Sequence, residues 1–155
     1  MTVSALALWE SLSKRPGGKW AFSRLVSWKA PYAASIQAHF EQLRPGYCEV
    51  SMRKRRSVLN HLGTIHAIAM CNMAELAGGT MTDVTVPPTH RWIPTGMTVE
   101  YLKKATKDLI AIARFASEPN WASSNEHNVG VEISESGGPL VFRATISMRV
   151  TARDA

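Results

Sequence analysis

The sequence contains few cysteines and no long apolar run, and both absences narrow the class of protein. Cys48 and Cys71 are the only cysteines, and their spacing is not that of a CxxC pair. This excludes a disulfide framework and a zinc motif, so we expect a reducing, cytoplasmic environment and no metal. His66, Asn72 and Glu75 interrupt the longest apolar segment, which falls short of the roughly 18 residues of a membrane span. The chain is therefore expected to be soluble.

The composition is typical of one compact domain. The chain has 155 residues, of which 45% are hydrophobic and 19% are charged. This is enough to bury a core and too little for two ordinary domains, so we predict a single domain over residues 1–155. Residues 1–14 lack the basic start of a secretion signal and are expected to belong to the fold. The formal net charge of +6 predicts attraction to anions without distinguishing nucleic acid, membrane or a phosphorylated cofactor.

The periodicity of apolar residues predicts helices first and then mostly strands. Two short helices are expected at residues 3–13 and 20–28, within an N-terminal segment that comprises residues 1–30. Residues 65–77 are rich in Ala, Met, Ile and Leu, which indicates a buried helix, and Gly78-Gly79 is interpreted as its stop. Strands are predicted at residues 36–43, 47–56, 91–104, 109–117, 128–134 and 140–151.

This order of elements favours an α+β fold in which an antiparallel sheet wraps around one long buried helix. The core of the fold is expected to span residues 36–152. A sheet of this kind covers only one side of a helix. A helix that is apolar all round therefore needs further cover, either from the N-terminal helices or from a second chain.

The start of the predicted buried helix carries a motif. The chain has Asn60-x-x-Gly63-x-x-His66, followed nine residues later by Glu75 on the same helix. This pattern resembles the phenylacetyl-CoA-type branch of the hotdog-fold acyl-CoA thioesterases, and in particular an uncharacterised bacterial subgroup with a His-Ala-Ile helix start. Residues 96–105 resemble the strand that follows the helix in that superfamily. The resemblance covers residues 36–152 and implies a hotdog fold, an acyl-CoA substrate and no cofactor apart from the coenzyme A of that substrate.

The chemistry of the helix start can be argued from the residues themselves. If Thr64 caps the helix, the first-turn N–H groups, including that of Ala67, have no acceptor within the helix and lie at the positive end of its dipole. Such a group can stabilise an oxyanion. In the family the corresponding N–H polarises the thioester carbonyl. The family commonly has Gly-Gly after the His, whereas Ala67-Ile68 here keeps the N–H but leaves less room beside it.

The spacing between His66 and Glu75 predicts a dimer. Nine residues at about 100° each place the two side chains on opposite sides of the helix and roughly 13 Å apart along it. They cannot serve one site within a chain, whereas two antiparallel copies of the helix would bring Glu75 of one chain toward Ala67 of the other. We therefore expect a homodimer with two shared sites, and a dimer of dimers stays open. Glu75 is expected in an apolar setting, where a carboxylate is a stronger base or nucleophile.

Other residues near the motif have both a functional and a structural interpretation. Asn60 either holds the thioester carbonyl or a water, or it orders a turn. His66 either positions the substrate or caps the helix. Asn72 either orients Glu75 or satisfies a buried backbone group. The predicted substrate-binding residues are Gly63, Ile68, Asn72, Lys103 and Lys104.

Basic residues occur in two runs. Residues 53–56 read Arg-Lys-Arg-Arg, which suggests either phosphate binding or a charged edge strand protected against aggregation. Lys103 and Lys104 are candidates for the phosphates of coenzyme A, or they are a charged strand end. Nucleic-acid binding rests on the net charge and one basic run alone, so we do not expect it.

The leading hypothesis is hydrolysis of an acyl-CoA thioester to a free acid and coenzyme A. In this hypothesis the Ala67 N–H polarises the carbonyl, Glu75 of the second chain activates water or attacks directly, and Asn60 and His66 position the reacting group. Two alternatives stay open: hydration or dehydration of an acyl thioester, and binding of acyl-CoA or an acyl carrier without catalysis. The acyl group cannot be predicted from the sequence.

Overall fold

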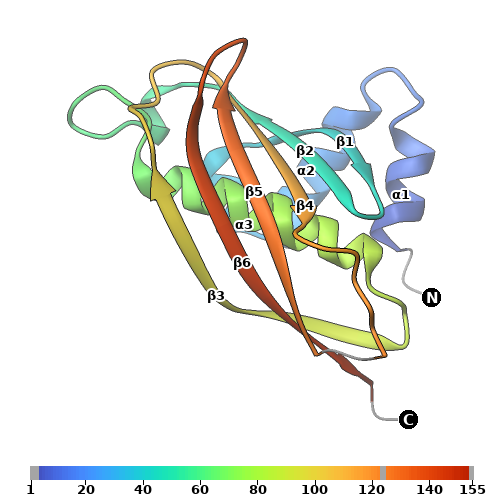
Figure 1. The fold of residues 1–155 in the computed structure, drawn as a ribbon. Helices are drawn as coiled ribbons and strands as arrows, with labels where there is room; N and C mark the ends of the chain where they lie inside the picture. Colours follow the sequence, from blue (N-terminus) through green and yellow to red (C-terminus); the bar gives the residue numbers. More distant parts are fainter. Residues whose placement is uncertain (1–3, 123–124, 154–155) are drawn as a thin grey trace.

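In the described residues, 4–122 and 125–153, a six-stranded antiparallel sheet curves around one long helix, α3 (Figure 1). The structure is a computed structural model. The strand order is β1-β2-β4-β5-β6-β3, so β1 and β3 form the edges. In chain order the elements are α1 (Ala5–Leu12), α2 (Gly18–Lys29), the short helix η1 (Ala33–Ile36), β1 (His39–Arg44), β2 (Tyr47–Met52), the short helix η2 (Arg56–Val58), α3 (Ala67–Thr85), β3 (His90–Tyr101), β4 (Leu109–Phe115), β5 (Glu126–Glu135) and β6 (Leu140–Ala152).

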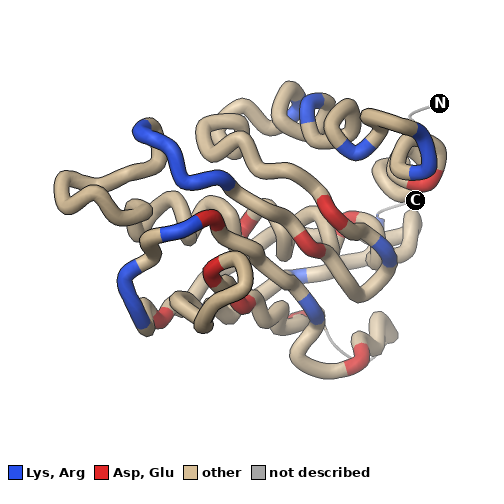
Figure 2. Tube along the Cα trace, turned by 90° about the horizontal axis from the view of Figure 1, so that it is seen from above, with Lys and Arg blue, Asp and Glu red and all other residues tan. Residues whose placement is uncertain are grey.

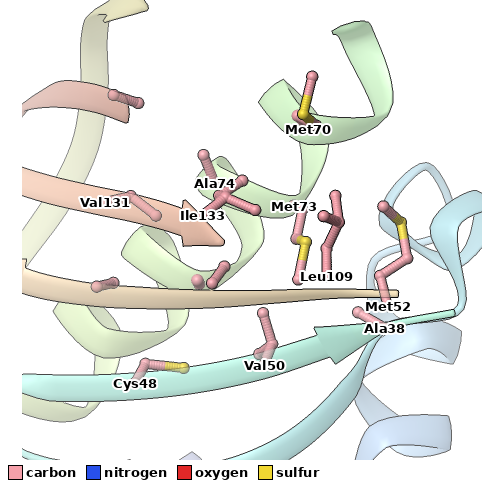
Figure 3. Packing of buried hydrophobic residues seen from close by; sticks show 14 of the residues in the cluster. Ala38, Cys48, Val50, Met52, Met70, Met73, Ala74, Leu109, Val131 and Ile133 are labelled. Atoms are coloured by element: carbon pink, nitrogen blue, oxygen red, sulfur yellow. The ribbon is translucent and has the colours of Figure 1, made fainter. Parts of the chain in front are cut away.

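The concave face of the sheet and the inner side of α3 form the hydrophobic core. Met73 and Ala74 of the helix pack with side chains of the sheet, among them Leu109 and Ile133 (Figure 3). In β5, every second residue is buried, as expected for a strand with one face on the core. The predicted α+β fold, with an antiparallel sheet wrapped around one long helix, is confirmed.

The helix continues beyond its predicted stop, so the interpretation of Gly78-Gly79 as a terminator is wrong. Both glycines are buried inside α3, which ends only shortly before Pro87. A Cβ atom on Gly78 would lie 2.9 Å from Cδ1 of Ile146, and one on Gly79 would lie 3.2 Å from the ring of Trp92. The two glycines therefore allow the helix to approach the strands closely, a role that sequence alone does not separate from termination.

The N-terminal helices and the first strands agree with prediction except at their ends. α1 and α2 correspond to the helices predicted at residues 3–13 and 20–28, although residue 3 lies outside the described residues. β1 begins later than predicted because residues 33–36 form η1. β2 ends at Met52, so residues 53–56 follow the strand. Because β2 lies between β1 and β4, the interpretation of this basic run as an edge strand is wrong.

The outer side of α3 is open in the single chain. Ile68 is 53% exposed and Glu75 is also exposed, so the further cover that was expected from the N-terminal helices or a second chain is incomplete within one chain. The reason is geometric, because the sheet reaches only one side of the helix. η1 covers part of the other side, where the buried Asn72 donates from Nδ2 to Oγ of Ser35 at 3.2 Å.

β3 forms an outer edge of the sheet and is exposed along most of its length. It pairs with β6 on one side, and no strand among the described residues pairs with its other side. Ile93 is 60% exposed and Tyr101 is 50% exposed, although both are large apolar or aromatic side chains. Apolar residues on an unpaired edge favour pairing with another chain.

Close packing at Gly78 can be tested by substitution. We expect Gly78→Val to lower the free energy of unfolding by about 1–3 kcal/mol, because a branched side chain would collide with Ile146 and Val129. Gly96→Val is the matched control, since a Cβ atom there meets nothing within 4 Å and the stability should change little. Chemical denaturation measures both variants. Equal unfolding midpoints for Gly78→Val and the wild type would contradict the packing role.

Candidate active site

The loop before α3 is ordered by Asn60. Its Oδ1 accepts hydrogen bonds from the backbone N–H groups of Leu62 and Thr64, at 3.0 and 3.1 Å. Its Nδ2 donates to Oγ1 of Thr64 at 2.8 Å. Gly63 completes the turn with φ at 74°, a left-handed conformation that favours glycine. In this structure Asn60 and Gly63 therefore order the turn that leads into the helix.

His66 is the N-cap of α3, and the expectation that Thr64 caps the helix is wrong. The His66 ring accepts through Nδ1 from the backbone N–H of Ile68 at 3.1 Å. The chain before the helix stays extended because the His66 N–H donates to the carbonyl of Val58 at 2.8 Å. A neutral imidazole that accepts at Nδ1 carries its proton on Nε2. His66 therefore presents a hydrogen-bond donor on the side of the ring away from the helix.

The backbone N–H of Ala67 has no hydrogen-bond partner among the described residues. The neighbouring N–H groups are occupied: that of Ile68 by the His66 ring, and those of Ala69 and Met70 by the His66 carbonyl. The Ala67 N–H is thus left at the positive end of the helix dipole. A donor in this position can bind a carbonyl oxygen and stabilise the oxyanion that forms from it.

Glu75 lies on the outer side of α3, where it lines a cavity of about 500 Å³ together with Tyr32 and Trp92. The side chain is exposed in the single chain, so the prediction of an apolar setting is wrong for one chain. Met73 and Ala77 are buried because helical geometry turns them toward the sheet, and the same geometry turns Glu75 away from it. Desolvation of this carboxylate must therefore come from a second chain or from a bound molecule.

A smaller cavity of about 180 Å³ lies beside the start of α3 and is lined by His66 and Ile68. Asn72 and Tyr32 line both cavities, so the two hollows adjoin each other. The Nδ2 of Asn72 donates to the carbonyl of Tyr32 at 3.3 Å. Of the two interpretations of Asn72, the contacts agree with satisfaction of a backbone group rather than with a hydrogen bond to Glu75.

Basic residues gather at the end of the molecule that carries the start of α3. Residues 53–56 follow β2, and Lys103 and Lys104 are exposed in the loop that follows β3. Figure 2 shows the Lys and Arg positions along the backbone in blue. The Lys54 N–H donates to the carboxylate of Asp108 at 2.8 Å, which joins the two segments. The two lysines predicted to bind phosphate therefore lie in a loop that is tied to the basic run.

The loop that carries these lysines is anchored by Glu135. Its Oε1 accepts from the N–H groups of Thr106 and Lys107 at 2.6 and 3.1 Å, and from the Thr106 hydroxyl at 2.9 Å. These bonds, led by the one from the Thr106 backbone, hold the pKa of the Glu135 carboxyl below its usual value. The same loop supports the approach to α3, because the Ala105 carbonyl accepts from the Ile65 N–H at 2.9 Å.

The cavity lined by Glu75 is a feature that the sequence did not predict. Its walls come from α2, η1, α3 and the start of β3, which are far apart in the sequence. Trp92 packs against Gly79 and donates its indole N–H to Asp83 at 3.2 Å. In the sequence, only Asn72 indicated a contact on this side of the helix, because it is a polar residue in an apolar segment. The residues that it contacts could not be predicted.

The described residues contain neither a membrane-spanning helix nor a metal centre. No helix among them is long and apolar enough to cross a lipid bilayer. No group of three or more His, Cys, Asp or Glu side chains in the same residues is placed to hold a metal ion. The groups that remain for chemistry at the candidate site are the Ala67 N–H, the His66 ring and the Glu75 carboxylate.

The arrangement of sheet and helix is shared with solved structures. A thioesterase family protein from Silicibacter pomeroyi has a TM-score of 0.72 and 16% identity, covering 84% of this chain and 96% of that one. A Streptococcus mutans protein bound to acetyl-CoA has a TM-score of 0.65 and 18% identity, covering 76% of this chain and 91% of that one. A genomics target has a TM-score of 0.83 and 48% identity, covering 96% of this chain and 98% of that one. None of the curated proteins matches the chain.

An antiparallel sheet wrapped around one helix, shared with thioesterase-family structures, defines a hotdog-fold protein, as the motif at the helix start predicted. At the level of sequence, a family model described as "Domain of unknown function (DUF4442)" matches residues 18–150. The chain belongs to this family. The description of the family names no activity.

Anchoring by Glu135 should make the stability of the fold depend on pH. The pKa of Glu135 is lower in the folded chain than in the unfolded chain. Its carboxylate therefore stabilises the fold at pH values above the unfolded-state pKa of about 4.3. This stabilisation is lost as the pH falls through the folded-state pKa, where the native carboxyl takes up a proton. We expect the melting temperature of the wild type to fall more steeply with acidification below about pH 4.3 than that of Glu135→Gln, which does not titrate.

Thermal unfolding over a series of pH values measures this difference. Glu132→Gln is a suitable control, because Glu132 is exposed and its ion pair with Arg143, at 3.2 Å, is also exposed. Parallel pH profiles for the wild type and Glu135→Gln would show that the anchor contributes nothing to stability.

Proposed function

We propose that the protein hydrolyses the thioester bond of an acyl-CoA, giving a free acid and coenzyme A. The observation that carries this proposal is the Ala67 N–H, which lacks a partner among the described residues, on the helix whose open side bears Glu75. The Ala67 N–H can stabilise an oxyanion, and Glu75 can activate a water molecule. Hydrolysis of a thioester requires both. The thioesterase name of a protein with the same fold supports the same reaction.

The two groups can serve one site only if two chains contribute to it. Glu75 is the eighth residue after Ala67, which corresponds to about 12 Å along the helix. We therefore propose a homodimer in which the outer sides of two α3 helices lie antiparallel, so that Glu75 of one protomer faces the partner's Ala67. Exposed Ile68 on the helix and Ile93 on the unpaired edge of β3 supply apolar surface for this interface.

In the proposed reaction the thioester carbonyl oxygen accepts a hydrogen bond from the Ala67 N–H. Glu75 takes a proton from a water molecule, whose oxygen bonds to the carbonyl carbon. The tetrahedral intermediate then breaks its carbon–sulfur bond, and coenzyme A leaves with the proton held by Glu75. A direct attack by the Glu75 carboxylate, followed by water, is the other route. Direct attack expels coenzyme A and forms a mixed anhydride, and water that attacks its Glu75 carbon leaves heavy oxygen in Glu75, so label in Glu75 after a single turnover in heavy-oxygen water identifies this route.

The remaining predicted residues have supporting roles in this proposal. His66 donates from Nε2 to the substrate beside the Ala67 N–H, and Asn60 and Gly63 act through the turn that holds His66. Lys103 and Lys104 bind the phosphates of coenzyme A as exposed cations near the start of α3. The mechanism requires no metal and no cofactor beyond the coenzyme A of the substrate.

Glu75→Gln should abolish turnover and leave the fold intact, because the amide keeps the size of the exposed side chain but cannot act as a base. Release of free coenzyme A from a panel of acyl-CoA thioesters measures the rate, and thermal unfolding checks the fold. Glu10→Gln, the same change at an exposed position of α1, is the matched control and should keep full activity.

Full activity in Glu75→Gln would end the proposed role of Glu75 as base or nucleophile. An enoyl or hydroxyacyl product in place of free coenzyme A would indicate hydration or dehydration. Tight binding of acyl-CoA without turnover by the wild type would indicate a binding protein.

Ala67→Pro removes the proposed oxyanion donor and keeps the helix, because proline is tolerated at the first helical residue. His66 has ψ at 137°, which is compatible with a following proline. We expect kcat to fall about 10²–10³-fold. Ala67→Gly keeps the N–H and should retain turnover. An unchanged kcat in folded Ala67→Pro would show that this N–H does not stabilise the transition state.

The same two inactive variants reveal whether a site takes residues from two chains. In a mixed dimer of Glu75→Gln and Ala67→Pro chains, one site carries both changes and the other carries neither. Random pairing after co-expression should therefore restore about a quarter of wild-type activity. If each site lies within one chain, every site keeps one change and the mixture stays inactive.

A further inference from the structure

The cavity that Glu75 lines is larger than cleavage of a thioester bond requires. Its volume of about 500 Å³ lies within the range of about 300–1,000 Å³ that is typical of small-molecule sites. Leu76 and Gly79 of α3 line it on one side, and Val26 and Ala30 of the N-terminal segment line it on the other. The reacting carbonyl would occupy only the end next to Glu75, so the rest of the volume is available to another part of the substrate.

The chemistry of the lining suits a hydrocarbon group. Charged groups other than Glu75 are Lys29 and Asp83, both exposed, and Asp83 already accepts the indole N–H of Trp92 at 3.2 Å. The buried Asn72 uses its amide group to hold η1. Apart from these groups and Thr80, the side chains that line the cavity are aliphatic or aromatic, and covering them with an apolar group is favourable.

The wall of this cavity is tied to the rest of the fold. The Arg55 guanidinium donates to the carbonyl oxygens of Ser35 and Ile36, both at 2.9 Å, and so fixes η1. The Ser23 hydroxyl accepts from the Phe40 N–H at 2.9 Å, which joins α2 to β1. The cavity is therefore preformed, and a ligand would not have to order its walls.

We propose that this cavity binds the acyl chain of the thioester, and that the N-terminal segment sets the length of chain the enzyme accepts. The inference rests on the proposed function, because Glu75 connects the cavity to the reacting carbonyl. An acetyl group would leave most of the volume empty. The substrate class is therefore acyl-CoA with an apolar chain of medium or greater length, and Ala30 and Leu76 determine specificity.

Two substitutions change the volume in opposite directions. Ala30→Phe fills the cavity from the N-terminal segment, and Leu76→Ala enlarges it from α3. The wild type should have a higher kcat/KM for decanoyl-CoA than for acetyl-CoA, because each buried methylene contributes about fourfold. Ala30→Phe should lower this decanoyl-to-acetyl ratio about tenfold or more, and Leu76→Ala should shift the preference toward longer chains. Ala7→Phe, the same change at an exposed position of α1 outside the cavity, should leave the ratio unchanged.

An unchanged ratio in Ala30→Phe and Leu76→Ala, or a wild-type preference for acetyl-CoA, would overturn this inference and leave the proposed hydrolysis standing. If the wild type hydrolyses no acyl-CoA, the proposed function fails, and titration calorimetry with decanoate tests the cavity alone. Binding by the wild type and Ala7→Phe but not by Ala30→Phe would support an acyl-chain site. Equal binding by all three proteins, or no binding to any, would overturn it.

Discussion

The limited reach of the sheet over α3 is the constraint on which the rest of this structure depends. The sheet buries one stripe of the helix, which contains Met70, Met73, Ala77 and Met81, and Gly78 lets helix and strands approach closely. A sheet on one side leaves the opposite side of the helix to other elements. The N-terminal segment covers part of that side. What remains is a helix surface, next to an unpaired strand edge, on which a shared site can be built.

Because the sheet covers only one side of α3, the helix is buried there while its proposed reactive groups stay exposed. The backbone before the helix is tied to neighbouring segments, so α3 begins with His66 as its cap and leaves the Ala67 N–H available. Glu75 points away from the core although its neighbours in the sequence are apolar. In one chain its side chain is exposed to solvent where it lines the cavity. A second protomer and a bound acyl chain would exclude that water, which links dimerisation and substrate binding to reactivity in the proposed function.

Hydrophobic periodicity was sufficient to predict the order of the helices and strands, but it failed where one residue type has two uses. Gly78-Gly79 looked like a helix stop and is a packing contact, because glycine serves both purposes. Thr64 looked like the cap, yet its hydroxyl and N–H bond to Asn60, and the cap is His66. Of the two interpretations of the basic run at 53–56, phosphate binding or a charged edge strand, the second is wrong because an edge position depends on the strand order and not on charge.

The sequence by itself determined the class of fold, the Asn60–Gly63–His66 turn at the helix start and the distance to Glu75, because periodicity and turn chemistry depend on neighbours along the chain. Only the tertiary structure decided which N–H group of the first helical turn has no partner among the described residues, which side of α3 is open, and that residues 26–33 form a cavity with Glu75. These features arise from contacts between segments that are distant in the sequence, and no local pattern encodes where such segments meet.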